Sequence, residues 1–169
     1  DEINRGNLSK IFGELFMLIE KDKRGIELQL LYSDENFSVP SNVYIIGMMN
    51  TADRGLAMLD YALRRRFSFF TMKPGFNTPG FQAYQDSLKN DALNKLIACV
   101  KQLNSQIVED ISLGEGFCIG HSYFCGLTPE TANTQTLSSI VEYELIPLLK
   151  EYWFDEPAKI VDWSDRLRS

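Results

Sequence analysis

Residues 43–54 are VYIIGMMNTADR, an apolar run that ends abruptly in a polar cluster. Apolar side chains occupy both alternating faces of the run, which is typical of a central strand covered by helices on both sides. In α/β folds, polar residues that directly follow such a strand lie at the sheet edge where ligands bind. The sequence therefore predicts an α/β domain with a candidate site at residues 50–54.

The residues before this run predict a helix and a β-hairpin. From Asn7 onward apolar residues recur every three or four positions, the pattern of an amphipathic helix that ends near Gly25. Two short alternating segments, 26–30 and 37–39, flank a polar turn and predict paired strands.

The second half of the chain is predicted to be mainly helical. Pro and Gly concentrate at residues 73–80, which indicates a subdomain boundary. Helical spacing then continues through residues 81–107 and 137–152, the last stretch despite Pro147. We expect an α/β part at residues 1–74 and a helical part at residues 75–169.

Composition excludes several classes of function. The net charge of −6 and pI near 4.8 argue against a broad basic face for nucleic acid. Three cysteines and one histidine fit neither a disulfide framework nor a structural zinc site. Apolar runs are too short to cross a bilayer, so we expect a soluble, cytoplasmic protein without a membrane partner.

Two acids, Asp1 and Glu2, open the chain. At a strand's carboxyl end, one acid can hold Mg²⁺, directly or through water, while its neighbour orients the attacking water in phosphoryl transfer. Two solvated acids at the start of a helix explain the same pair. The pair alone therefore leaves both interpretations open.

Asn50 and the arginines at 64–66 are further candidates. The Asn50 amide can bind a phosphate oxygen without adding negative charge, although a turn with Asp53 as helix cap is an equal explanation. The arginines follow a short helix predicted at residues 56–63, whose dipole favours cations at its end. Three consecutive arginines are more than a helix cap requires. The guanidinium group can stabilise negative charge that develops in a transition state, including one in a neighbouring subunit.

Three segments together, DEINR at 1–5, MNTADR at 49–54 and DYALRRRF at 60–67, resemble the AAA+ motor domain of the McrB family of GTPases in order and spacing. The predicted hairpin resembles the pre-sensor hairpin of one AAA+ branch, and residues 119–124, IGHSYF, resemble part of the family's C-terminal subdomain. The resemblance covers essentially the whole chain. It implies a partial AAA+ P-loop NTPase core, a parallel-sheet remnant with a hairpin insert, followed by a helical lid.

The resemblance also implies roles for individual residues. Asp1 is the Mg²⁺-associated acid and Glu2 the residue that activates water. Asn50 corresponds to the sensor that contacts the γ-phosphate. Arg65 and Arg66 match arginine fingers that reach the nucleotide of a neighbouring subunit.

Four further residues are placed near the nucleotide or the subunit interface. Asp53, Arg54 and Asp60 lie in motif positions that organise this interface, and His121 is grouped with the nucleotide-binding residues. His121 is the sole histidine, and from the residues alone a hydrogen-bonded structural residue in a turn is favoured over a catalytic role.

The function implied by the resemblance is that of a ring, hexameric or similar, which hydrolyses GTP with Mg²⁺. Hydrolysis drives DNA translocation and cleavage by a partner nuclease of the McrC type, and DNA is contacted by regions outside this chain. The phosphate loop G-x-x-x-x-G-K-[ST] is absent from the 169 residues. We therefore expect a fragment that begins inside the catalytic motif, is inactive alone and leaves residues 43–49 as an exposed strand edge.

Three alternatives remain open. A MoxR-like remodeller shares these motifs but uses ATP, and nothing in the residues themselves distinguishes the two nucleotides. A noncatalytic assembly module would explain the missing phosphate loop. A nucleic-acid-binding domain built on residues 64–66 is disfavoured by the acidic balance.

Overall fold

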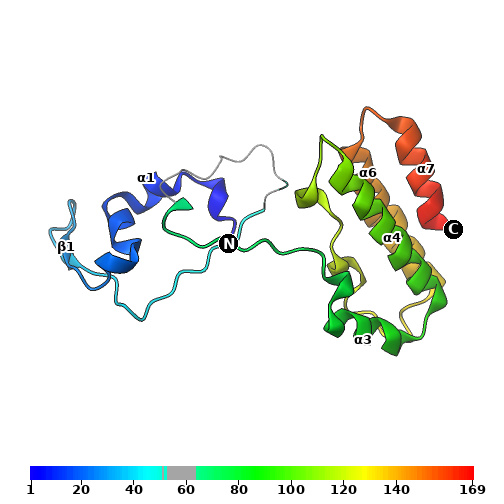
Figure 1. The fold of residues 1–169 in the computed structure, drawn as a ribbon, viewed down its shortest axis with the longest axis horizontal. Coiled ribbons are helices and arrows are strands. Elements are labelled where there is room, and N and C mark those ends of the chain that lie inside the picture. The colour runs from blue at the N-terminus through cyan, green and yellow to red at the C-terminus, as the bar shows by residue number, and fades with distance from the viewer. Residues whose placement is uncertain (51, 53–63) are drawn as a thin grey trace. The chain divides into compact units, whose positions relative to one another are not determined.

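The computed structural model describes residues 1–50, 52 and 64–169. Predictions for Asp53, Arg54, Asp60 and the helix at 56–63 lie outside the described residues. The chain divides into two compact units, Asp1–Thr71 and Met72–Ser169, each considered by itself (Figure 1). The domain division predicted from the sequence, 1–74 and 75–169, stays a prediction.

The first unit consists of short elements. They are the 3-10 helix Ile3–Arg5, α1 (Leu8–Phe12), the 3-10 helices Gly13–Ile19 and Lys21–Lys23, β1 (Leu28–Gln29) and β2 (Asn36–Phe37). The helix predicted from Asn7 is confirmed at its start, where the Asn7 side chain accepts a hydrogen bond from the Lys10 amide. It does not continue as one α-helix because Gly13, at φ 51° and ψ −126°, interrupts the hydrogen-bond ladder.

The predicted β-hairpin is confirmed, although it is shorter than expected. β1 and β2 pair antiparallel, with Leu28 opposite Phe37 and Gln29 opposite Asn36. The prediction of a buried central strand at residues 43–49 is wrong for this structure. No strand is assigned to these residues, and Tyr44 and Ile46 are 87% and 89% exposed.

The physical reason for this difference is the lack of paired neighbours. An extended segment becomes a strand only when adjacent backbone groups complete its ladder. Within the described ranges β1 and β2 form the only sheet. Among the described residues, one backbone hydrogen bond joins the start of the chain to the 43–49 segment: the Ile3 amide donates to the Met48 carbonyl at 3.0 Å. Its apolar side chains are therefore left exposed, as expected for an uncovered edge.

The second unit confirms the prediction of a helical half. Its elements are the 3-10 helix Gly75–Asn77, α3 (Pro79–Leu88), α4 (Asp91–Glu109), the 3-10 helices Glu115–Phe117 and His121–Phe124, α5 (Thr134–Ile140), the π-helix Val141–Leu145, α6 (Ile146–Tyr152) and α7 (Pro157–Arg168). Asn90 and Asn133 cap α4 and α5 through their side-chain oxygens. Pro147 lies in the first turn of α6, directly after the π-helix Val141–Leu145, so the chain changes its helical hydrogen-bond pattern at the point where proline lacks an N–H.

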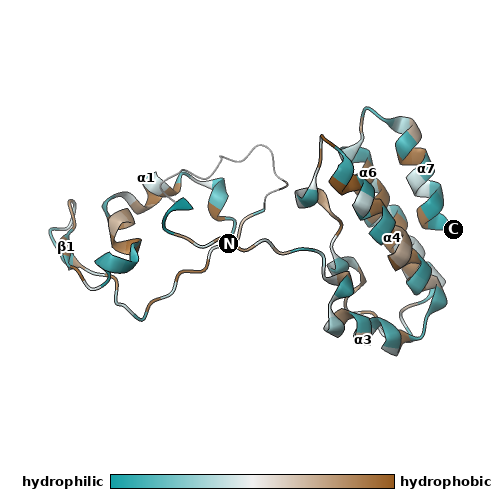
Figure 2. Cartoon of the chain, in the orientation of Figure 1, coloured by the Kyte–Doolittle hydropathy of each residue, from teal (hydrophilic) through white to brown (hydrophobic). Residues whose placement is uncertain are grey.

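The core of the second unit lies along α4. Apolar and polar segments alternate along this helix (Figure 2), and one face is buried: Leu93, Leu96, Ile97, Val100, Leu103 and Ile107. α7 packs against both α4 and α6 (Figure 1). A bundle of this kind buries one stripe of each helix, which is why the helical spacing of the sequence predicted it well.

The Asp110 carboxylate joins the end of α4 to the start of α7. Its Oδ2 accepts hydrogen bonds from Lys159 Nζ at 2.7 Å and from Trp153 Nε1 at 2.8 Å. Its Oδ1 accepts from the Ser112 amide and hydroxyl at 2.9 and 2.7 Å. The bond from Lys159, followed by those from Ser112 and Trp153, holds the pKa of Asp110 well below its usual range.

Replacing Asp110 with asparagine is expected to destabilise the chain by about 2 kcal/mol at pH 7, because a paired carboxylate is lost. A depressed folded-state pKa stabilises the protein above the unfolded pKa, and this stabilisation is lost as the pH falls through the folded value. The gap in unfolding free energy between wild type and variant should therefore narrow below about pH 4. Urea unfolding of the wild type and the variant at pH 7, 5 and 3 measures this difference in unfolding free energy.

The control is Asp155→Asn, because Asp155 is an exposed acid between α6 and α7. It should change stability by less than about 0.5 kcal/mol. An equal loss for Asp110→Asn at pH 7 and pH 3 would contradict a role for the ionised carboxylate.

Candidate functional site

Two segments that are distant in sequence meet at the first residues of the chain. The Ile3 amide donates to the Met48 carbonyl at 3.0 Å, and Asn4 Nδ2 donates to the Asn50 carbonyl at 2.9 Å. One contact is made by a backbone amide of the 3-10 helix Ile3–Arg5 and the other by a side chain of the same helix. Asn4 is buried, so its amide fixes the acidic motif beside residues 48–50.

The two acids at this junction are exposed. The Glu2 amide donates to Asp1 Oδ1 at 2.9 Å, and the Glu2 carboxylate pairs with Arg5 Nε at 2.7 Å. An exposed pair of this kind contributes little free energy, so Glu2 can exchange this partner for another at small cost. Glu2 also has a left-handed backbone, with φ 49°, a conformation that is uncommon outside glycine and is enriched at functional sites.

Asn50 uses one half of its side-chain amide within its own turn. Its Oδ1 accepts from the Ala52 amide at 3.0 Å, which is an Asx-turn. The NH₂ group is the half of the amide that can donate to a phosphate oxygen. Through Ile3 and Asn4, the structure thus holds the segment that directly follows Asp1 and Glu2 against residues 48–50.

The donor set at this place suits a hard cation. Mg²⁺ binds through one or two carboxylates and completes its shell with water and substrate phosphates. Asp1 and Glu2 supply two carboxylates of this kind. Among the described residues no group of three or more His, Cys, Asp or Glu side chains is arranged to hold a metal ion.

The two arginines predicted as fingers have different environments. Arg66 is only 13% exposed, pairs with Glu20 and places its guanidinium 4.3 Å from the centre of the Phe16 ring. Arg65 is exposed. Arg66 is therefore held inside the first unit, whereas Arg65 lies at its surface.

His121 belongs to the second unit. Its Nδ1 accepts a hydrogen bond from the Gly75 amide at 2.9 Å. The Phe76 and Phe81 rings pack against it in T-shaped arrangements, with ring centroids at 6.2 and 5.4 Å. These contacts are those of a residue that supports the local backbone.

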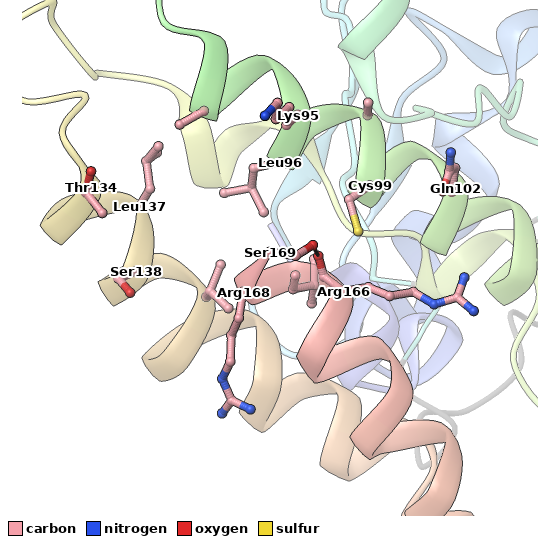
Figure 3. A pocket seen from close by; sticks show the side chains of 14 residues that line it. Lys95, Leu96, Cys99, Gln102, Thr134, Leu137, Ser138, Arg166, Arg168 and Ser169 are labelled. Carbon is pink, nitrogen blue, oxygen red and sulfur yellow. Dashed lines mark hydrogen bonds between the residues drawn. The ribbon is translucent and has the colours of Figure 1, made fainter.

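A hollow of about 710 Å³ in the second unit contains none of the predicted site residues (Figure 3). It is lined by α4, α5 and the end of α7. Two of its cations are neutralised by acids of the same unit: Arg166 pairs with Asp162 at 3.0 Å, and Arg168 pairs with Glu142 at 2.5 and 3.0 Å.

Sequence reasoning missed two residues that organise the candidate site. Asn4 lies inside the DEINR segment, but its cross-link to Asn50 spans 46 residues and no local pattern predicts such a bond. Glu20 lies in the charged stretch at the end of the first predicted helix, where an acid is normally expected to be solvated, so its pairing with Arg66 could not be predicted. Tertiary contacts alone identify both.

Comparison with known proteins identifies a domain family for each half of the chain. Residues 1–67 match the family model described as the AAA domain of the dynein-related subfamily. The first unit therefore contains part of an AAA domain. Residues 95–161 match the model described as the alpha-helical lid domain of McrB.

Two relatives extend the comparison. The chain is 51% identical, over 177 aligned residues, to the type IV methyl-directed restriction enzyme EcoKMcrB subunit of Escherichia coli K12; the match covers 99% of the chain and 39% of that protein. It is 30% identical to the type II restriction enzyme BsuMI component YdiS of Bacillus subtilis 168, with 69% and 40% covered. The chain belongs to the McrB family, and it spans about two fifths of the length of these relatives.

The fold class predicted from the sequence is thereby confirmed as a partial AAA+ core followed by a helical lid. The resemblance to MoxR-like remodellers is not favoured. In the part of the chain that the structure describes, no helix has the length and apolar character needed to span a membrane.

Proposed function

We propose that the whole protein is a ring-forming GTPase subunit of a restriction system, whose hydrolysis drives DNA translocation and cleavage by a nuclease partner of the McrC type. The observation that carries the proposal is the junction of the acids with Asn50, held by the Ile3–Met48 and Asn4–Asn50 bonds. Both relatives are named as parts of restriction enzymes, which supports the cellular role.

Each group at the junction has one task in the proposed reaction. Asp1 would hold Mg²⁺, directly or through water, and a bound ion would supply positive charge beside the phosphates. Glu2 accepts a proton from the attacking water and orients it. The Asn50 NH₂ group donates to the γ-phosphate.

The remaining site residues act at the subunit interface. Arg65, exposed at the surface of the first unit, reaches the nucleotide of the adjacent subunit and stabilises transition-state charge. Asp53, Arg54 and Asp60 organise the same interface. DNA binds to regions outside this chain, the ring acts in the cytoplasm, and the chain alone is inactive because it has no phosphate loop.

The first test is steady-state hydrolysis of GTP and ATP by the full-length protein, with and without its candidate nuclease subunit. GTP-selective turnover that rises with the nuclease is the expected result. Preference for ATP would show that the protein is an ATPase and not a GTPase. No turnover under either condition would favour a noncatalytic assembly module.

Arg65→Ala in the full-length protein should lower hydrolysis by about 10³-fold, because an arginine finger typically contributes that much. Mixing it with Glu2→Gln subunits should restore part of the activity. The reason is that each Arg65→Ala subunit keeps Glu2, while its Glu2→Gln neighbour supplies an intact Arg65. Turnover of the two variants, alone and mixed, measures this complementation.

Arg64→Ala serves as the matched control, since Arg64 is an adjacent exposed arginine. It should retain hydrolysis within about threefold, in line with the small effects of exposed substitutions. If the mixture is no more active than the two inactive variants measured separately, Arg65 does not act in trans.

A further inference from the structure

The chain enters the second unit through a short segment that the loop of residues 114–124 holds in place. Lys73 Nζ pairs with Glu115 Oε1 at 3.0 Å, and the Gly75 amide donates to His121 Nδ1 at 2.9 Å. Phe76 is buried and packs against His121 and Phe124. Residues 73–76 are thus attached to the second unit within a few residues of its start at Met72.

The contact between Gly75 and His121 depends on both residue types. A Cβ at position 75 would lie 2.9 to 3.2 Å from imidazole atoms, so only glycine allows this approach without a shift. The bond also requires His121 Nδ1 to be an acceptor, which is the case only for the neutral ring with its proton on Nε2. We call this pair of residues the His121–Gly75 latch.

The loop that carries His121 is itself attached to the bundle core. Asn104, on α4, donates to the Ile119 carbonyl at 2.9 Å and accepts from the Ile119 amide at 2.7 Å. The Tyr84 hydroxyl, on α3, lies 2.9 Å from the Phe124 carbonyl. The latch therefore connects residues 73–76 to two helices of the bundle through hydrogen bonds and not only through packing.

We propose that His121 is a positioning residue of the nucleotide reaction: it fixes residues 73–76 to the lid, so that the lid and this segment move as one body. The inference rests on the proposed function. Lids gate enzymatic reactions by closing over bound substrate, and hinge motion is absorbed by a few residues. With the latch intact, bending is confined to residues before 73. Residues 73–76 are then already ordered, so nucleotide binding costs no further conformational entropy in this segment.

The role differs from contact with the nucleotide, which the resemblance implied for His121. The imidazole is directed at the Gly75 backbone and flanked by two phenylalanine rings. A residue that acts in this way influences binding through the conformation of the lid. Substitutions that keep the acceptor should then keep the function.

The test compares His121→Ala, His121→Asn and the wild type in the full-length protein. Asparagine places an amide oxygen near the position of Nδ1 and can accept the same bond, whereas alanine cannot. We expect about a tenfold rise in the KM for nucleotide with His121→Ala and a smaller change in kcat, with recovery in His121→Asn. Ser122→Ala, an exposed neighbour in the same loop, should match the wild type.

Hydrogen exchange at the Gly75 amide gives a readout that is independent of activity. This amide should be protected in the wild type and in His121→Asn and should exchange faster in His121→Ala. Protection that is the same in all three proteins would overturn the latch. Loss of protection without a change in KM, or an equal defect in both variants, would overturn the positioning role and leave His121 as a packing residue.

The two experiments also separate this inference from the proposed function. If the wild-type protein hydrolyses no nucleotide, the proposed function fails, and with it the positioning role, whereas exchange at Gly75 still decides whether the latch exists. If turnover is normal and the exchange result is negative, only the inference about His121 fails.

Discussion

Glu2→Gln in the full-length protein is expected to lower nucleotide hydrolysis by about 10³-fold while nucleotide binding is retained. Glutamine keeps the size of the side chain and an oxygen that can accept from Arg5, but it cannot accept a proton from water. General-base catalysis contributes about 10² to 10⁴ in rate, and loss of the base should cost most of this. Single-turnover hydrolysis and equilibrium binding of nucleotide measure the two effects separately.

The control for this variant is Glu35→Gln, which removes an exposed carboxylate in the hairpin connection. It should change neither rate nor binding. If Glu2→Gln keeps more than about half of the wild-type rate, another group activates the water and the assignment of Glu2 is wrong. If binding is lost together with the rate, Glu2 acts on the Mg²⁺–nucleotide complex and not on the water.

Trp153→Ala should be the most destabilising single substitution considered for the second unit, by about 3–5 kcal/mol. Trp153 has no exposed surface. Its indole N–H donates to Asp110, and Lys159 lies 4.3 Å above its ring. The substitution therefore opens a cavity and also removes one donor from the Asp110 carboxylate. Denaturant unfolding followed by circular dichroism, which detects loss of the helices, gives the free energy.

Phe154→Ala is a closely matched control, because the next residue is also aromatic but is 80% exposed. It should cost less than about 0.5 kcal/mol. Trp153→Phe should fall between the two alanine variants, since it keeps most of the apolar volume and loses the indole donor. A similar cost for Phe154→Ala and Trp153→Ala would contradict the assignment of Trp153 to the core.

The helical half of the fold could be predicted from local patterns. The spacing of Leu93, Val100 and Ile107 identifies the buried face of α4, and the Asn90 and Asn133 caps mark where helices begin. Helix hydrogen bonds join residues four positions apart, so a single stretch of sequence contains most of what a helix requires. The error at residues 43–49 has the opposite cause, because a strand depends on neighbours that local sequence does not supply.

Part of the candidate site could also be predicted. The resemblance of residues 1–5 and 49–54 to AAA+ motifs predicts roles for Asp1, Glu2 and Asn50, and the Asn4 cross-link holds the segment after the two acids against the Asn50 backbone. The difference in burial between Arg65, which is exposed, and Arg66, which is not, could not be predicted from the sequence. Adjacent arginines have identical chemistry, and burial of one against Phe16 and Glu20 arises from contacts with a segment more than forty residues earlier.

By itself the sequence determined the family and the helical lid, because motifs and helical periodicity lie in consecutive residues. The same motifs predict which acids and which amide form the candidate site. Only the tertiary structure decided which arginine is exposed, how Asn4 ties the acids to Asn50, and that His121 faces the Gly75 backbone. These are contacts between residues far apart in the chain. Their free energies depend on distance, burial and orientation, which are defined only once the chain has folded.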